Sequence, residues 1–299
     1  MSEVASNFIE PVPISELEDP NVKMHFLHHF PVYKKDPNST TPCRRVFNAS
    51  FRVKGNVSLN DCMLKRPSLT PNILKVQLRM RLKKYLMCAD VSKAFLRVLL
   101  HYVDRNFTCF YVRKTWEDPN SPVEVFRFKV VLFGSTASPF LLNATILHLF
   151  ECNDLLDFLM DCYVDNLFFE LDSVEELMEA MNKAIQLFDS ASMPLREWAS
   201  NSEVMNGKFK DLGIFTKSEG KMKTLGYTWD FESDKLSLAQ VNFEIENVCK
   251  RSMFSNFCSV YDPMGLITPS SIRAKVVAQS CWSIGIQWDP PVPEDIKTK

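Results

Sequence analysis

Short apolar runs and helical repeats alternate along the chain, which predicts a mixed α+β fold. Runs that favour strands occupy residues 26–52, where two strands flank a polar loop, and residues 85–91, 125–133 and 221–230. Helical spacing marks residues 72–84. Ser138 as an N-cap before Pro139 predicts a helix over 138–150, and a capping box of Ser173 and Glu176 predicts one over 173–189. A last helix begins at Thr268 and Pro269, with an apolar face of Ile272, Val276, Val277 and Cys281. Residues 236–250 suit a helix or a strand equally well. The polar, Pro-rich residues 1–22 predict an arm without a core.

The sharpest local signal is an apolar segment that two polar residues interrupt. Residues 157–171 read D-F-L-M-D-C-Y-V-D-N-L-F-F-E-L, and Asp165 and Asn166 separate the two apolar runs. Asp and Asn are frequent at tight turns, so the pattern predicts a β-hairpin with this pair at its tip. The apolar strand at 85–91 also carries a carboxylate near its end, Asp90. Because the order is strand, helix, hairpin, we expect the two carboxylates to lie on adjacent strands.

Composition identifies the class of protein only broadly. The chain has 299 residues, 46% of them hydrophobic and 24% charged, which excludes a collagen-like, low-complexity or largely disordered protein. Residues 130–150 carry no formal charge, but Gly134, Pro139 and several polar side chains interrupt them, so we expect no membrane span. The N-terminus lacks a signal-peptide pattern, and nine cysteines are scattered without a C-x-x-C pair. These features predict an intracellular, cytoplasmic protein whose thiols are reduced and mostly in the core.

The net charge of −1 conceals an uneven distribution. From Lys23 to Arg97, 16 Lys and Arg stand against three acids, a net charge of +13. From Glu151 to Ser190, one Lys stands against eleven acids. A basic region suits a polyanion such as nucleic acid, and an acidic region concentrates cations. Both regions could equally be solvated faces, so charge alone does not decide between these interpretations.

Asp90 and Asp165 are the candidate metal ligands. Divalent ions need oxygen ligands from converging carboxylates, and two ions about 4 Å apart can activate a hydroxyl and stabilise a leaving phosphate. Mg²⁺ suits this hard-oxygen chemistry, with Mn²⁺ as the alternative. The competing interpretation is structural: Asp90 would cap the turn that follows it, and Asp165 would form the tight turn.

The letters around these acids resemble the reverse transcriptases of LTR retrotransposons, most closely those of the BEL/Pao group. A-D-V-S-K-A-F at 89–95 is similar to the first metal-binding motif of that family, and C-Y-V-D-N at 162–166 to its Y-x-D-D hairpin. L-F-G-S-T-A-S-P-F-L-L-N at 132–143 is similar to its template- and nucleotide-contacting motif. Further similar segments follow the family's order at 28–61, 195–201, 225–230 and 261–269. The resemblance therefore covers nearly the whole chain, about residues 24–290.

The resemblance implies a right-hand polymerase of the α+β class. After the arm at 1–22, the fingers would cover residues 23–82 and 105–138, the palm 83–104 and 139–235, and the start of a thumb or connection 236–299. The activity would be RNA-directed DNA polymerisation, in which two divalent metals promote attack of the primer 3′-hydroxyl on a deoxynucleoside triphosphate. The partners would be these triphosphates and a primed RNA or DNA template. In a polyprotein, protease, RNase H and integrase modules would be adjacent, and the protein would be particle-associated in an active element.

The resemblance also implies roles for single residues. Asp90 and Asp165 would hold the metals together with the backbone oxygen of Val91, and Asn166 would complete the catalytic set. The nucleotide-binding residues would be Lys34, Lys35, Arg44, Phe95 and Gly134, and the primer-binding residues Gly226, Tyr227 and Trp229. Each role has a plain alternative: a general basic face for the cations, a core residue for Phe95, a loop glycine for Gly134, and a packed β-turn for the last three. His28 and His29 lack partners at metal-ligand spacing and are not expected to bind a metal.

Two positions depart from the family's pattern. Asn166 stands where a second Asp is expected in the hairpin, and Asn48 replaces the usual Asp of the fingers segment. Asn offers a carbonyl oxygen but no charge, so the site loses one of three expected carboxylates. Two other functions therefore stay open: an impaired remnant that binds nucleic acid without extending it, and a protein-interaction role. The general acid for the leaving pyrophosphate also stays open among Arg196, Lys208 and Lys210.

Overall fold

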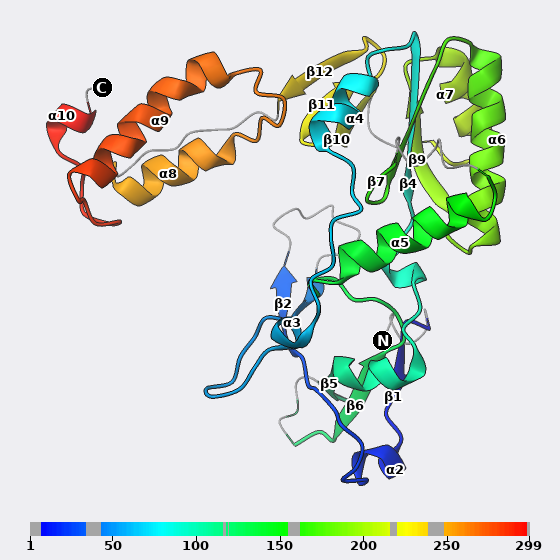
Figure 1. The fold of residues 1–299 in the computed structure, drawn as a ribbon, viewed down its shortest axis with the longest axis vertical. Coiled ribbons are helices and arrows are strands. Elements are labelled where there is room, and N and C mark those ends of the chain that lie inside the picture. The colour runs from blue at the N-terminus through cyan, green and yellow to red at the C-terminus, as the bar shows by residue number, and fades with distance from the viewer. Residues whose placement is uncertain are drawn as a thin grey trace. The chain divides into compact units, whose positions relative to one another are not determined.

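The computed structural model describes residues 7–33, 43–115, 118, 120–154, 162–215, 220–238 and 248–297. Helices and strands are interspersed along the chain (Figure 1), as the sequence predicts for an α+β fold. The chain divides into two compact units, each built from segments that are far apart in sequence. Unit 1 comprises Met1–Pro71, Val91–Asn166 and Lys183–Leu195, and unit 2 comprises Asn72–Asp90, Leu167–Asn182 and Arg196–Lys299.

One sheet of unit 1 joins the N-terminal segment to the middle of the chain. Its order is β1-β6-β5, with β1 at Ile9–Pro11, β5 at Cys109–Arg113 and β6 at Val123–Phe128. All pairs are antiparallel, and the 3₁₀ helix η2 (Tyr102–Thr108) leads into β5. Ile9 pairs with Phe128, and both side chains are buried in a core that also contains Phe110 and Leu132.

The N-terminal segment is part of this core, so the prediction of an arm without a core is wrong. Ile9 and Val12 are buried, and the short helix α2 (Ile14–Leu17) follows them. The polar residues of the segment bind a buried cation. Arg127, only 2% exposed, donates to Glu10 at 2.7 Å, to Glu16 at 2.5 Å and to Asn106. Composition could not reveal this because Arg127 lies more than 100 residues away from both acids.

A hairpin and a short capped helix complete the basic part of unit 1. Strand β2 (His28–Tyr33) pairs antiparallel with β3 (Cys43–Asn48), which confirms the two predicted strands. Helix α3 (Leu59–Cys62) begins with a capping box in which Ser58 and Asp61 exchange hydrogen bonds. The Arg52 guanidinium, with Ser58, holds the pKa of the Asp61 carboxyl well below its usual range.

Helix α5 (Ser138–Glu151) begins where Ser138 and Pro139 predict, but Ser138 is not its N-cap. The N-cap is Ala137, without a side-chain cap, and the Ser138 hydroxyl donates to the carbonyl of Leu132 at 2.7 Å. The uncharged stretch is a buried helix face: Leu142, Ile146 and Phe150 are at most 1% exposed. None of the helices that the structure describes has the length and apolar character needed to cross a membrane.

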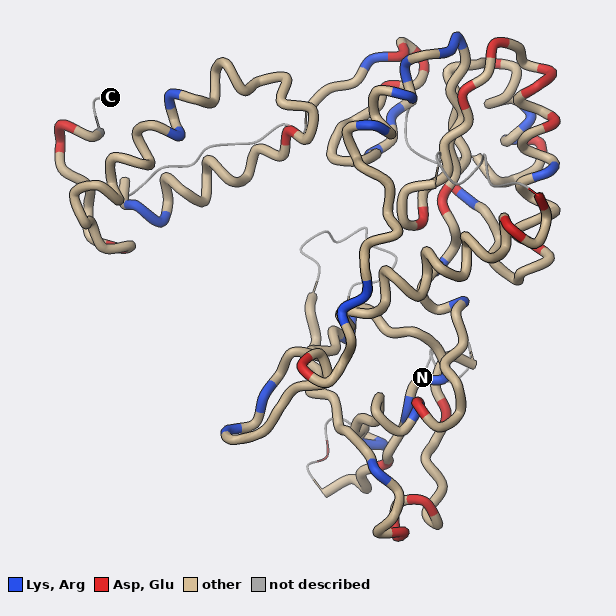
Figure 2. The backbone as a smooth tube through the Cα atoms, viewed as in Figure 1, with Lys and Arg blue, Asp and Glu red and all other residues tan. Residues whose placement is uncertain are grey.

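A four-stranded sheet has the order β7-β8-β4-β9. Its strands are β4 (Tyr85–Val91), β7 (Cys162–Tyr163), β8 (Asn166–Leu171) and β9 (Leu195–Ser200). Side chains Leu86 to Ala89 are all buried, as expected for a strand that is covered on both faces. Helix α6 (Val174–Ser190) begins with the predicted capping box of Ser173 and Glu176, and acidic residues line it (Figure 2). Helix α7 (Glu203–Asp211) follows β9.

A small three-stranded sheet in unit 2 has the order β10-β11-β12. It contains β10 (Lys221–Thr224), β11 (Tyr227–Asp230) and β12 (Lys235–Leu238), so the segment from 236 begins as a strand. Helix α4 (Ile73–Arg79) holds this sheet through Gln77, whose amide donates to the carbonyl of Leu225 at 2.9 Å. The helix begins directly after its N-cap, Asn72, the first residue of the predicted segment, but it ends before the predicted residue 84.

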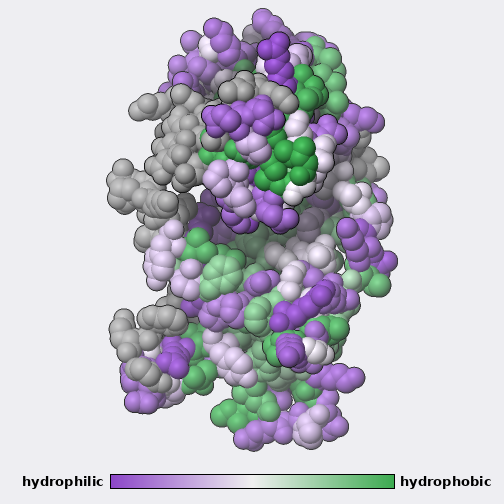
Figure 3. Space-filling model, turned by 90° about the vertical axis from the view of Figure 1, so that its left-hand side faces the viewer, coloured by the Kyte–Doolittle hydropathy of each residue, from purple (hydrophilic) through white to green (hydrophobic). Residues whose placement is uncertain are grey.

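The C-terminal part of unit 2 is helical. It contains α8 (Lys250–Ser259), α9 (Thr268–Ser283) and α10 (Glu294–Lys297). Cys281, Val292 and Ile296 form its small core, whereas Ile272 and Val276 of the predicted apolar face are exposed. On the face drawn in Figure 3, apolar residues (green) lie in patches among hydrophilic ones.

The cysteines are free thiols, as predicted, but they are not mostly in the core. Four are buried (Cys88, Cys109, Cys162 and Cys281), four are exposed (Cys43, Cys62, Cys152 and Cys258), and Cys249 is intermediate. Burial raises the pKa of the Cys109 thiol to about 11. The Cys109 thiol therefore stays protonated at neutral pH and acts as a small apolar side chain.

Candidate functional site

The end of strand β4 lies against the turn that joins β7 to β8. The N–H of Val91, the last residue of β4, donates to the carbonyl oxygen of Asp165 at 2.8 Å. Asp90 directly precedes Val91, and β8 neighbours β4 in the sheet. The predicted adjacency of the two strands is therefore confirmed, and a backbone hydrogen bond fixes the position of Asp165 relative to Val91.

The hairpin turn lies one residue earlier than the sequence predicts. Val164 and Asp165 form the turn, and Asn166 already begins β8, because Val164 adopts a left-handed backbone with φ of 60°. A β-branched residue in this region is strained, at a cost of roughly 1–2 kcal/mol. Strain of this kind persists only where the surroundings enforce it, and it is common at functional sites. Residues 157–161 of the predicted hairpin lie outside the described residues.

Asn166 turns its side chain toward Asp165. Its Nδ2 donates to Oδ1 of Asp165 at 2.9 Å, and both side chains are partly exposed. A second carboxylate at this position would place two negative charges next to each other, which only a cation could stabilise. The Asn side chain instead makes a hydrogen bond that needs no cation.

Asp90 has a partner that the sequence did not predict. Nε of Arg196, on β9, donates to Oδ2 of Asp90 at 3.0 Å. The Asp90 side chain is 19% exposed and the Arg196 side chain 50% exposed. The only sequence signal for this pair is the position of Arg196 in the L-R-E-W-A-S-N segment, 106 residues away from Asp90. Arg196 is also one of three candidates for the general acid. The other two, Lys208 and Lys210, lie in the last turn of α7.

The residues assigned to nucleotide binding occupy two places in unit 1. Arg44 is exposed on β3, opposite Val32 of β2, whereas Lys34 and Lys35 lie outside the described residues. Phe95 belongs to the 3₁₀ helix η1 (Ala94–Arg97) and is half-buried. Its ring meets the edge of Phe133, with centroids 4.9 Å apart, and Phe133 is 59% exposed. Phe95 is therefore part of a surface aromatic pair and not of the core.

Gly134 follows this pair and needs the conformational freedom of glycine. Its φ is +93°, and a Cβ would lie 3.2 Å from the carbonyl oxygen of Phe47. Asn60 fixes the loop, because its amide donates to the Gly134 carbonyl at 3.0 Å and its Oδ1 accepts from Thr136 N–H at 2.9 Å. Sequence reasoning missed Asn60, although it lies within the S-L-N-D segment that carries the resemblance.

The residues assigned to primer binding form a tightly packed turn in unit 2. Tyr227 is 2% exposed and Trp229 is fully buried. The Trp229 indole donates to Asp234 at 2.8 Å, and the Tyr227 hydroxyl donates to Asp262 at 2.8 Å. A Cβ on Gly226 would lie 2.2 Å from two ring carbons of Tyr261, so the ring covers this glycine. The packed-turn interpretation of Tyr227 and Trp229 is thus the one that their contacts favour.

Asp262 organises the loop before α9. Its carboxylate accepts the N–H groups of Leu266 and Ile267 in addition to the Tyr227 hydroxyl. Burial alone would raise the pKa of the Asp262 carboxyl, but the Ile267 N–H and the Tyr227 hydroxyl hold this pKa below its usual value. Burial also raises the pKa of Tyr227.

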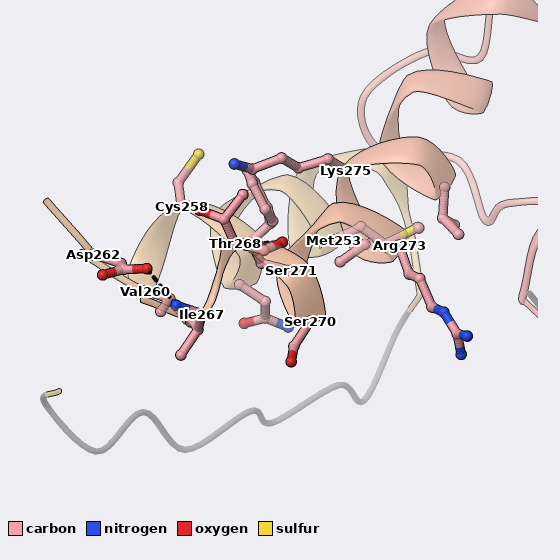
Figure 4. A pocket seen from close by; sticks show the side chains of 14 residues that line it. Met253, Cys258, Val260, Asp262, Ile267, Thr268, Ser270, Ser271, Arg273 and Lys275 are labelled. Carbon is pink, nitrogen blue, oxygen red and sulfur yellow. Dashed lines mark hydrogen bonds between the residues drawn. The ribbon is translucent and has the colours of Figure 1, made fainter. Parts of the chain in front are cut away.

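One cavity, lined by α8, α9 and the loop between them, contains none of the residues that the sequence assigns to catalysis. It has a volume of about 740 Å³, and its lining includes Asp262, Thr268, Ser271, Arg273 and Lys275 (Figure 4). In Figure 4, a dashed line marks the Asp262–Ile267 hydrogen bond at its edge. A second cavity, of about 600 Å³ in unit 1, is lined by His25, His28, His29 and aromatic rings.

The oxygen donors at the ends of these strands suit a hard divalent cation. Asp90 and Asp165 supply carboxylates and Asn166 an amide oxygen, which are ligands of Mg²⁺ and Mn²⁺. Among the described residues, no three His, Cys, Asp or Glu side chains gather as a ready metal cluster. The donor chemistry therefore fits a divalent cation, but with fewer charges than three carboxylates would provide.

Comparison with known proteins identifies the class of protein. The family model described as Reverse transcriptase (RNA-dependent DNA polymerase) matches residues 37–227, more than half of the chain. The chain therefore belongs to the reverse transcriptase family. A second family model, the Pao retrotransposon-like RNaseH-like domain, matches residues 249–299. The two matches confirm the resemblance to reverse transcriptases of the BEL/Pao type, and the second covers most of the segment predicted to begin a thumb or connection.

Solved structures support the same fold. A foamy viral protease-reverse transcriptase dRH in complex with double-stranded DNA matches with a TM-score of 0.63 at 14% identity, over 99% of this chain and 44% of that chain. A foamy viral protease-reverse transcriptase in complex with an RNA/DNA hybrid matches with a TM-score of 0.60 at 14% identity, over 99% of this chain and 34% of that chain. These matches confirm the predicted α+β polymerase fold. The chain spans less than half the length of either protein, and no curated protein sequence matches it.

Proposed function

We propose that the chain is an RNA-directed DNA polymerase that extends a primer on a nucleic-acid template with deoxynucleoside triphosphates. The observation that carries the proposal is the hydrogen bond from Val91 N–H to the Asp165 carbonyl at 2.8 Å. It ties the residue after Asp90 to the strained turn of the hairpin, so both motifs of the family's metal site meet at one sheet. The nucleic acids held by the similar foamy viral proteins support a primed template as substrate.

In this proposal Asp90 and Asp165 hold the divalent cations, with Mg²⁺ as the physiological choice. Bound there, divalent cations would supply the Lewis acidity that lowers the pKa of the primer hydroxyl and stabilises the leaving pyrophosphate. The protein's contribution is to position the carboxylates in advance. The hydrogen bond from Val91 fixes the backbone of Asp165, and the buried strand β4 fixes the backbone of Asp90.

The exposed residues near the β2–β3 hairpin and the 133–136 loop would bind the triphosphate and select its sugar. Arg44 is exposed and offers a guanidinium to phosphate oxygens, which it can contact in bidentate fashion. Phe95 and Phe133 together present a rigid aromatic surface that would exclude a 2′-hydroxyl by volume. Asn60 and Gly134 would keep the loop beside them in place.

A second candidate function is binding of primed nucleic acid without extension, and Asn166 favours it. The Asn166–Asp165 hydrogen bond stabilises the hairpin without a cation and takes part of the Asp165 carboxylate. The net charge of +13 from Lys23 to Arg97 would support such binding on its own. The two functions differ only in whether the hairpin exchanges this hydrogen bond for a metal.

The test is primer extension on an RNA template with Mg²⁺ and, separately, Mn²⁺. Asp90→Asn and Asp165→Asn should each lower the extension rate by at least about 100-fold, since even outer-shell partners of metals cost 10–100-fold. Asn166→Asp should raise the rate, because it restores a charge next to Asp165. Asp172→Asn is the matched control, since Asp172 is exposed and pairs with Lys83. Extension by Asp90→Asn at the native rate would contradict the proposal.

The same samples separate the two functions. Binding of a labelled primer–template is measured across a range of NaCl concentrations, and contacts to phosphates give a slope of roughly −0.9 per contact for a duplex. Steep salt-dependent binding by all variants, with no extension by any of them, would support the non-extending function. Absence of binding at moderate salt would point to a protein-interaction role.

A further inference from the structure

The ion pair of Asp90 and Arg196 uses a carboxylate that the proposed function assigns to a divalent cation. Arg196 is the second residue of β9, which neighbours β4 in the sheet. Its Nε lies 3.0 Å from Oδ2 of Asp90, on a carboxylate that the proposed function assigns to a divalent cation. A guanidinium and a metal ion cannot bind the same oxygen together without strong repulsion between their charges. Arg196 therefore competes with any cation at Asp90.

The competition is reversible because the pair is accessible to water. The Arg196 side chain is 50% exposed, and exposed ion pairs contribute no more than about 1 kcal/mol. Arg127 in unit 1 shows the opposite situation, since it is 2% exposed and bound by two glutamates. The Asp90–Arg196 pair can therefore open at low cost, whereas the Arg127 pairs cannot.

Arg196 also has a second acid within reach. Oε1 of Glu197 lies 3.9 Å from its Nε, and the Glu197 side chain is 54% exposed. Glu197 adopts a left-handed backbone with φ of 53°. When Asp90 accepts a cation, the guanidinium can keep a negative partner by moving toward Glu197 and solvent.

We propose that Arg196 sets the affinity of Asp90 for divalent cations, by occupying its Oδ2 in the absence of a cation and releasing it when one binds. Arg196 is thus a positioning residue that acts through Asp90. This inference rests on the proposed function, because it needs Asp90 to be a metal ligand. The effect adds to that of Asn166. Asn166 removes one of the three expected carboxylates, and Arg196 places a positive charge beside one of the remaining two, so both residues lower the negative charge available to a cation.

The test measures Mn²⁺ binding directly, with the full chain and without nucleic acid, by the electron paramagnetic resonance signal of free Mn²⁺. Arg196→Gln should bind Mn²⁺ about 3- to 10-fold more tightly, which corresponds to loss of a competing pair of about 1 kcal/mol. Arg196→Lys keeps the charge and should stay within about twofold of the native chain. Arg251→Gln is the matched control, because Arg251 forms a comparable exposed pair with Asp289 and should leave Mn²⁺ affinity unchanged.

Asp90→Asn and the double variant Asp90→Asn/Arg196→Gln complete a cycle. If Arg196 acts through Asp90, Arg196→Gln should tighten binding only when Asp90 is present. Unchanged or weaker Mn²⁺ binding by Arg196→Gln, with Asp90→Asn weakening it, would overturn the inference and leave the proposed function intact. Unchanged Mn²⁺ binding by Asp90→Asn would overturn both.

Discussion

Clusters of arginine and carboxylates occur in both units of the chain, and they differ in how far water reaches them. In unit 1, Arg127 is 2% exposed and is held by Glu10 and Glu16, whose side chains are 24% and 18% exposed. In unit 2, Arg196 is 50% exposed and meets Asp90. A buried guanidinium cannot leave its acids without losing all solvation, whereas an exposed one exchanges them for water. The first cluster therefore fixes the fold, and the second leaves Asp90 available for a ligand.

Removing the buried arginine should have the largest effect. Arg127→Met would leave Glu10 and Glu16 without their cation in a part-buried site, and breaking such a pair costs about 3–5 kcal/mol. The free energy of unfolding of the full chain, measured in urea, should fall by this amount. Arg251→Met removes the exposed pair with Asp289 and should cost no more than about 1 kcal/mol. Equal losses in the two variants would show that burial does not distinguish the clusters.

Low pH should remove the stability that Glu16 contributes through its pairing with Arg127. The hydrogen bond from Arg127 lowers the pKa of Glu16, so the folded carboxyl titrates below its unfolded value of about 4.3. Its contribution to stability is therefore present above about pH 4.3 and is lost as the pH falls through the lowered folded pKa. Glu16→Gln should lose less stability than the native chain between pH 5 and 3, measured by urea unfolding at each pH. Parallel losses in the two proteins would rule out this role for Glu16.

The smallest effect should come from the exposed arginine. Arg196→Met should change the free energy of unfolding by less than about 1 kcal/mol, and added salt should reduce even this difference. The measurement is urea unfolding of both proteins at low and high NaCl concentration. A loss as large as that of Arg127→Met would mean that the Asp90–Arg196 pair fixes the fold and is not exchangeable.

The parts of the fold that sequence reasoning predicted are those that local patterns determine. Strand β4 was predicted at its observed bounds, because a continuous apolar run of seven residues suits a strand buried on both faces. Helix α6 was marked by its capping box and its apolar spacing. The hairpin was predicted one residue too late, because turn preferences place Asn at the tip and cannot foresee a left-handed Val164.

The parts that sequence reasoning missed depend on partners far away in the chain. The N-terminal segment looks like a polar arm until Arg127 is seen between Glu10 and Glu16. For the candidate site, motif order identified Asp90 and Asp165, but the Arg196 side chain on Asp90 and the Asn60 side chain on the 133–136 loop come from tertiary structure. A single sequence contains no local pattern that pairs such residues.

The ring of Tyr261 over Gly226 restricts where this chain could be divided for laboratory work. The reverse transcriptase match ends at residue 227, and a shortened protein that stopped there would lack Tyr261 and Asp262. It would expose the glycine turn and leave the buried Tyr227 hydroxyl without its acceptor. The minimal expressible fragment should therefore extend past the loop that Asp262 caps, so the boundary of the sequence family is not the boundary of the folding unit.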